Sequence, residues 1–184
     1  MKATDELKKE HQGVELMLRI LQAVSTRIER GEQIDSGHLD GMMEFFSIFV
    51  DKCHHGKEEE FLFPALEEAG VPNEGGPIGV MLSEHEKGRA LVAKLREATD
   101  CFKSGEGTVS RTFQAVTEEY VALLTQHIEK ENNVLYVMAD ARLDNAKDAE
   151  LFEAFEKLEH ERIGPGKHEE FHALLHQLRD IYLN

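Results

Sequence analysis

Apolar residues recur along most of the chain at alternating steps of three and four, the spacing that puts side chains on one face of an α-helix. In the first segment this stripe includes Leu7, Val14, Leu18, Leu21 and Ile28. Three later segments repeat the period, and runs of β-branched residues, which favour strands, are few. The pattern predicts an all-α protein.

Turn-forming residues divide these periodic segments. They gather in RGEQIDSG (30–37), EAGVPNEGGP (68–77), KSGEGT (103–108) and IGPGK (163–167). Glycine and proline interrupt helices, so each cluster marks a connection between two of them. We therefore expect an antiparallel up-down four-helix bundle over residues 4–140, with an additional C-terminal helical segment over residues 146–184. A chain of 184 residues is long enough for one such domain, spanning residues 1–184.

Each apolar stripe also carries a histidine, and two stripes add a glutamate one turn later. The six residues are His11, His54, Glu58, His85, His127 and Glu131. A glutamate four residues after a histidine projects from the same side of the helix. Burying a carboxylate costs several kcal/mol unless it is paired or bound to a metal. Because all six would point into one core, we expect them to bind a pair of transition-metal ions.

The His-x3-Glu spacing alone is weak, because His11 with Glu15 and His55 with Glu59 also fit it. Glu15 and Glu59 fall beside their stripes, which indicates a flanking position and a solvated face. Val134 and Met138 continue the fourth stripe beyond Glu131 and are expected in the core. The hypothesis depends on ligand-type residues coinciding with all four stripes. A metal-free bundle, in which the six groups hydrogen-bond to one another, is the plain structural alternative.

Charge narrows the range of partners. The chain has 21 Lys and Arg against 36 Asp and Glu, a net charge of −15, so nucleic acids and anionic membrane surfaces would be repelled. No window approaches the roughly 18 apolar residues of a membrane span. The N-terminus lacks the apolar run of a secretory signal, and the two cysteines form no spaced framework. We expect a cytoplasmic protein with reduced thiols.

Four motifs resemble those of hemerythrin-like (HHE cation-binding) domains. They are KKEHQ, CHHGKEEEFLFP, LSEHEKG and QHIEKENNVLYVMAD, within residues 5–140. The resemblance implies two iron ions in an oxo- or hydroxo-bridged di-iron centre that binds O2, peroxide or NO. It also implies roles for this chain's residues. The terminal ligands would be His11, His54, His85 and His127, and the bridging ligands would be Glu58 and Glu131.

The third motif departs from the family. Oxygen-carrying hemerythrins have a second histidine one turn from the first on the third helix, but here those positions hold Met81 and Arg89. One iron would then need a ligand from solvent, from a small molecule or from another part of the chain. The C-terminal segment offers candidates on one face, namely His168, His172 and His176, and Glu15 is a further one. The departure favours peroxide or NO chemistry over reversible O2 carriage.

Three alternatives for function stay open from the sequence. Redox activity on peroxide or NO would make the protein an enzyme, with an unknown redox partner. A sensor of oxygen, NO or iron, or an iron-storage or iron-donor protein, would use the same site without turnover. Finally, HEEFH at 168–172 matches the zinc peptidase pattern, with His168 and His172 as zinc ligands and Glu169 as base. This third alternative is remote, because the chain provides no third ligand one helix further on.

Overall fold

The computed structural model describes residues 2–105 and 109–183, and within these ranges it contains helices and no strand. The all-α prediction is confirmed. In chain order the elements are α1 (Ala3–Glu29), α2 (Ser36–Glu44), η1 (Phe45–His55), η2 (Glu58–Leu62), α3 (Phe63–Glu68), α4 (Pro77–Lys103), α5 (Val109–Lys130), η3 (Glu131–Leu135), α6 (Tyr136–Arg142), α7 (Asn145–Arg162) and α8 (Lys167–Tyr182). Residues 106–108 of the expected turn lie outside the described ranges.

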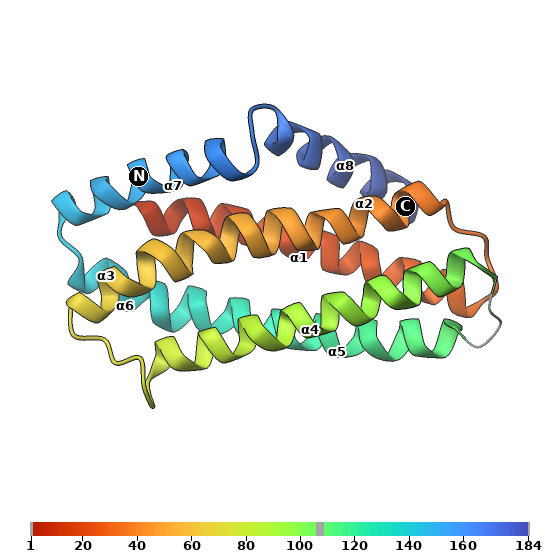
Figure 1. The fold of residues 1–184 in the computed structure, drawn as a ribbon, viewed down its shortest axis with the longest axis horizontal. Coiled ribbons are helices and arrows are strands. Elements are labelled where there is room, and N and C mark those ends of the chain that lie inside the picture. Colours follow the sequence, from red (N-terminus) through yellow and green to blue (C-terminus); the bar gives the residue numbers. More distant parts are fainter. Residues whose placement is uncertain (1, 106–108, 184) are drawn as a thin grey trace.

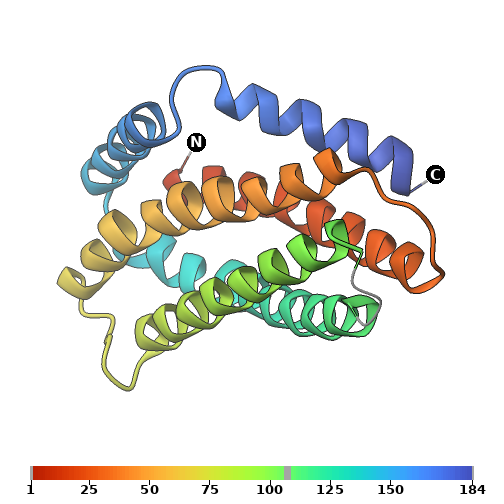
Figure 2. The ribbon, with the colours of Figure 1, turned by 45° about the vertical axis from the view of Figure 1, so that its right-hand side comes forward.

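Several of these elements join end to end. Residues 36–68 form one long rod from α2 to α3, and residues 109–142 form another from α5 to α6. With α1 and α4 they make four rods that lie side by side (Figures 1 and 2). Helix α5 packs against both α1 and α4, and α2 packs against α4. The expected C-terminal segment is two helices, α7 and α8, and both pack on α1.

Local sequence explains where several helices begin and end. The side chain of Asp35 accepts a hydrogen bond from the Gly37 amide and caps α2, and Asp144 caps α7 through the Lys147 amide. Pro77 opens α4, where a missing amide hydrogen costs nothing. The break between α7 and α8 needs backbone in the left-handed region, which Gly166 supplies at φ 86°. No described helix is both long and apolar enough to cross a membrane.

The buried apolar side chains form two clusters, one toward each end of the rods. One cluster includes Val14, Val50, Leu91 and Leu124, and the other includes Leu7, Leu62, Met81 and Leu135. The predicted ligand positions lie between these two groups in each rod. The polar residues are therefore sealed from both ends by apolar packing, which keeps the local dielectric low.

Three stretches, η1, η2 and η3, are π-helical, with hydrogen bonds from residue i to i+5 and a wider turn than an α-helix. A wide turn shifts the phase of the residues that follow it. The expectation for Val134 is wrong for this reason: its side chain is 50% exposed, while Leu135 and Tyr136 are buried. A strict 3.6-residue period cannot anticipate such a shift.

Candidate metal centre

The structure brings all six predicted ligands together. Each is at most 2% exposed. The carboxylate of Glu131 lies between two rods, with Oε2 3.1 Å from His11 Nε2 and Oε1 3.0 Å from His127 Nε2. The Oε2 of Glu58 lies 3.4 Å from His85 Nε2 and 3.8 Å from His54 Nε2. Each glutamate thus spans two histidines, as a carboxylate bridging two ions does.

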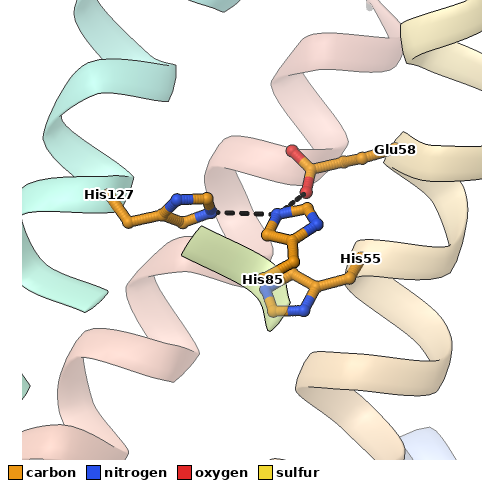
Figure 3. Close-up of side chains that lie close together, drawn as sticks. All are labelled: His55, Glu58, His85 and His127. Atoms are coloured by element: carbon orange, nitrogen blue, oxygen red, sulfur yellow. Dashed lines mark hydrogen bonds and ion pairs between the residues drawn. The ribbon is translucent and has the colours of Figure 1, made fainter. Parts of the chain in front are cut away.

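These residues, together with one neighbour, fall into two groups of ligand atoms. In each group the atoms lie within 4.8 Å of one another. One group consists of His11, His54 and Glu131, and the other of His55, Glu58, His85 and His127. Figure 3 shows the second group, in which Glu58 and His127 point toward His85. Glu131 Oε1 lies 3.8 Å from His85 Nε2, so the two groups adjoin.

Each predicted histidine ligand is held from behind through its Nδ1 atom. The partners are Asn132 Oδ1 for His11 at 2.9 Å, Glu10 Oε2 for His54 at 2.7 Å, Glu59 Oε1 for His85 at 2.7 Å and Glu84 Oε2 for His127 at 2.9 Å. An Nδ1–H that donates outward leaves the lone pair of Nε2 facing the interior. This arrangement is typical of metal-binding histidines, whose outer partners fix the tautomer and the ring orientation.

Cations brace all three of these outer carboxylates, with Lys57 donating to Glu10 at 2.6 Å. Arg89 donates to Glu59 at 2.6 Å and to Asp51 at 2.7 Å, and Lys130 donates to Glu84. Arg89 and Glu84 lie on α4, so the third rod contributes to the support as well as to the site. Glu59 was expected on a solvated face, but it is half-buried and bonded to His85, so that expectation is wrong.

The electrostatics of the cluster keep the carboxylate of Glu131 charged. Burial raises the pKa of Glu131, but His127, His11 and His85 outweigh it and hold this pKa well below its ordinary value. Burial opposes protonation of His85, yet Glu131, Glu58 and Glu59 raise its pKa to about 11. The metal-free cluster therefore holds its negative charge by keeping protons on imidazoles.

Several buried atoms of the cluster lack a hydrogen-bond partner among the described residues. They are His54 Nε2, His55 Nδ1, Glu58 Oε2 and both carboxylate oxygens of Glu131. Buried polar atoms are almost always satisfied, and leaving one unsatisfied costs about 1–3 kcal/mol. Imidazole nitrogens and carboxylate oxygens that meet in a dry interior are the donors that first-row transition metals take. The residues present therefore fit a metal centre.

Two residues at the centre were missed. Tyr136 donates from its hydroxyl to Glu58 Oε1 at 2.6 Å, and its ring stacks on His11 at a centroid distance of 5.5 Å. His55 was set aside in favour of His54, but it is 4% exposed and stacks on His85 at 3.8 Å. Both follow or end a π-helical stretch, where helical phase gives a misleading direction.

Lys57 is fully buried. Its Nζ lies 2.6 Å from Glu6, 2.6 Å from Glu10 and 3.1 Å from Glu159. A third group of ligand-type atoms, Glu10, Cys53 and Glu159, occurs around this amine. Because both carboxylates are already ion-paired with the ammonium of Lys57, this group is a charge-paired hub.

The C-terminal histidines lie outside both ligand groups. His168 Nδ1 is 2.8 Å from Glu159 Oε1, and His172 and His176 are exposed, as is Glu15 on α1. Within residues 2–105 and 109–183, no group of three ligand-type atoms includes His168 or His172. The zinc peptidase motif therefore has no third ligand among the described residues.

Comparison with known proteins agrees with this geometry. The family model described as the hemerythrin HHE cation binding domain matches residues 2–139. The chain belongs to this family. The family resemblance seen in the sequence is confirmed.

Relatives of the HHE chain come from several bacteria. An uncharacterized protein of Mycobacterium tuberculosis is 23% identical over 179 residues, covering 97% of this chain and 68% of the relative. The iron-sulfur cluster repair protein DnrN of Neisseria gonorrhoeae is 34% identical over 85 residues, 45% of this chain and 54% of the relative. The repair protein YtfE of Enterobacter sp. (strain 638) is 30% identical over 125 residues, which cover 65% of this chain and 56% of the relative. No solved structure matches the chain.

Proposed function

We propose that this HHE protein holds two iron ions and reacts with O2, peroxide or NO. The ligand set is the one expected from the sequence, with His11, His54, His85 and His127 as terminal ligands and Glu58 and Glu131 between the ions. The grouping of the ligand atoms further suggests His11 and His54 for one ion and His85 and His127 for the other. The proposal is carried by the four Nδ1 anchors, which turn four imidazole Nε2 atoms toward two shared carboxylates. Some relatives in sequence are named as iron-sulfur cluster repair proteins, which favours iron over zinc as the metal.

We further propose that the four rods make the antiparallel up-down bundle expected from the sequence. The order of colours along neighbouring rods in Figure 1 supports this arrangement. Residues 1–184 would then be a single domain, with α7 and α8 laid against α1. In such a bundle, ligands from facing helices meet in the core, which is where the two apolar clusters leave room for them.

A bound iron pair would supply one-electron redox chemistry and coordination positions for a small molecule. The chain's own residues would prepare the site for that chemistry. Glu58 and Glu131 supply two negative charges that offset the charge of the ions. The hydroxyl oxygen of Tyr136 lies 2.6 Å from Glu58 Oε1 and 3.4 Å from His11 Nε2, at the inner edge of the centre. Its proton is donated to Glu58. The apolar residues at both ends of the centre exclude bulk water.

Iron analysis of the purified protein tests the proposal directly. We expect about two irons per chain and near-ultraviolet bands typical of a bridged ferric pair. Glu58→Ala and Glu131→Ala should each lower the iron content sharply, whereas His168→Ala should leave it unchanged. A protein that takes up no iron, or three variants that lose iron equally, would contradict the proposed ligand set.

A second function uses the same centre without turnover. The repair proteins among the relatives favour an iron donor, and a sensor of oxygen, NO or iron is the related possibility. Peroxide consumption and NO reduction by the iron-loaded protein separate these from an enzyme. Turnover of either substrate supports redox activity. Iron retention without turnover, followed by transfer of iron to an iron-depleted acceptor protein, supports the donor.

A further inference from the structure

We propose that His55 is a fifth histidine ligand, which joins His85 and His127 in holding one of the two metal ions. This inference rests on the proposed di-metal function and adds a residue that the sequence pattern set aside. It makes the two ions unequal, with three imidazoles on one and two on the other.

The position of His55 carries the inference. Its side chain is buried, and one of its ring nitrogens lies within 4.8 Å of ligand atoms from Glu58, His85 and His127 (Figure 3). The His55 ring stacks on His85 at 3.8 Å and meets His127 edge-on at 5.8 Å. Three imidazoles from three different rods therefore surround one end of Glu58.

The outer side of His55 also faces a carboxylate, but at a longer distance and without the hydrogen bond that each of the other four histidines makes. Its Nδ1 lies 3.5 Å from Asp51 Oδ1, one turn back along the same rod. Asp51 is held by Arg89, and the same guanidinium holds Glu59, the partner of His85. A single cation on α4 thus fixes the carboxylates behind two neighbouring imidazoles. With Nδ1 directed at Asp51, the opposite nitrogen of His55 is the one free to face the cluster.

The wide turns of the second rod explain how adjacent residues serve different ions. In an α-helix, neighbouring side chains diverge by about 100°, so one of two adjacent histidines would point away from the core. Residues 45–55 are π-helical, and both His54 and His55 are buried. His54 groups with His11 and Glu131, whereas His55 groups with His85, His127 and Glu58. π-Helical turns frequently occur at functional sites.

His55 also lines a pocket of about 420 Å³ between η1 and α4, whose wall includes Val50, Arg89 and Tyr120. It could serve this pocket as a polar wall without touching a metal. The two roles differ in one respect that can be measured. A ligand changes the affinity and the spectrum of one ion, whereas a wall changes only the access of small molecules to the pocket.

The test is an anaerobic titration of the metal-free protein with Fe²⁺, followed by Mössbauer spectroscopy of the loaded protein. The variants are His55→Ala and His55→Gly, with His172→Ala on exposed α8 as the matched histidine control. For wild type and control we expect two tightly bound irons. For both His55 variants we expect one tight iron and a second bound about 10- to 100-fold more weakly, and a changed Mössbauer signal for one iron only.

Free imidazole provides the second measurement. Added to His55→Gly, it should restore the second tight site, and ¹⁵N-labelled imidazole should show a nitrogen coupling in the mixed-valence electron paramagnetic resonance signal. Two tight irons with an unchanged spectrum in both variants would overturn the inference while leaving the di-iron proposal intact. Wild-type protein that binds no iron would refute the proposed function itself.

Discussion

Glu10 connects the imidazole of His54 to a buried amine. Its Oε2 accepts a hydrogen bond from His54 Nδ1 at 2.7 Å, and its Oε1 lies 2.6 Å from Lys57 Nζ. Lys57 also pairs with Glu159, whose other oxygen lies 2.8 Å from His168 Nδ1. An unbroken series of polar contacts therefore runs from α8 through α7 and α1 to a predicted metal ligand.

Glu10→Gln should weaken iron binding without unfolding the protein. The amide keeps the size of the side chain but removes the negative charge that fixes the His54 tautomer and makes its Nε2 a stronger donor. Loss of such an outer partner typically costs 10- to 100-fold in metal affinity. Competition between the protein and a chelator of known affinity measures the change. Glu15→Gln, an exposed glutamate on the same helix, should bind iron like wild type. Equal affinities in all three proteins would contradict the prediction.

Lys57→Met should destabilise the metal-free protein by about 3–5 kcal/mol, because breaking a buried ion pair leaves an uncompensated charge. Methionine fills similar space but leaves Glu10 buried beside two further carboxylates. Urea denaturation followed by circular dichroism gives the free energy of unfolding. Lys52→Met, at an exposed position of the same rod, should change it by less than about 0.5 kcal/mol. A loss in Lys57→Met no larger than in Lys52→Met would mean that the amine is not essential to the hub.

The hub also predicts a dependence of stability on pH. The hydrogen bond from His168 lowers the pKa of Glu159 from 4.5 to about 2, with burial opposing and Lys57 assisting. A carboxyl with a depressed folded-state pKa contributes stability above its unfolded value and loses it as pH falls. The stability advantage of wild type over Glu159→Gln should therefore be full between pH 4.5 and pH 6, where His168 is protonated, and shrink toward pH 2.

The advantage is the free energy of unfolding of wild type minus that of Glu159→Gln, both measured without metal between pH 6 and about pH 2. Most other titrating groups contribute equally to both proteins, so their contributions largely cancel. Glu156→Gln, one turn earlier on α7, controls for the loss of a charge from this helix. An advantage that stays constant across the range would show that the Glu159 carboxyl has its ordinary pKa.

Tyr136→Phe should retain both irons and lower the reduction potential of the centre. The hydroxyl draws charge from Glu58 through a 2.6 Å hydrogen bond, so its removal makes this carboxylate a stronger donor to a ferric ion. The ring, which stacks on His11, remains. A spectroscopic redox titration provides the measurement, with Tyr120→Phe, a buried tyrosine of the same rod, as control. A potential that shifts equally in both variants would indicate a general packing effect.

The periodicity of apolar residues was sufficient to predict which way the side chains of the six proposed ligands point. His11 and His85 lie in regular α-helices, where an apolar stripe reports direction faithfully, and both histidines face the interior as expected. The pairs His54 with Glu58 and His127 with Glu131 combine that stripe with a one-turn spacing. The interpretation of these six residues as metal ligands stays a prediction, and their convergence makes it testable.

Periodicity could not predict the positions of the residues that surround these six. His55, Lys57 and Glu59 follow one another so closely that a regular helix would turn at least one of them to water, yet each is wholly or partly buried. Their positions depend on π-helical turns and on partners distant in sequence. Arg89 is the clearest example, since its contacts with Asp51 and Glu59 join α4 to the second rod. The pattern of apolar and polar residues in the sequence does not indicate such ion pairs between distant residues.

The π-helical turns make the directions of His54 and His55 sensitive to a change of a single residue. A wide turn is equivalent to one extra residue in an otherwise regular helix, and loss of one codon between residues 45 and 55 would remove it. The remainder of the rod would then rotate by about 100° relative to the preceding turns. One of the paired imidazoles would leave the interior. A deletion of one residue in this rod would thus remove a donor atom from the interior through helical pitch, while every histidine stays encoded.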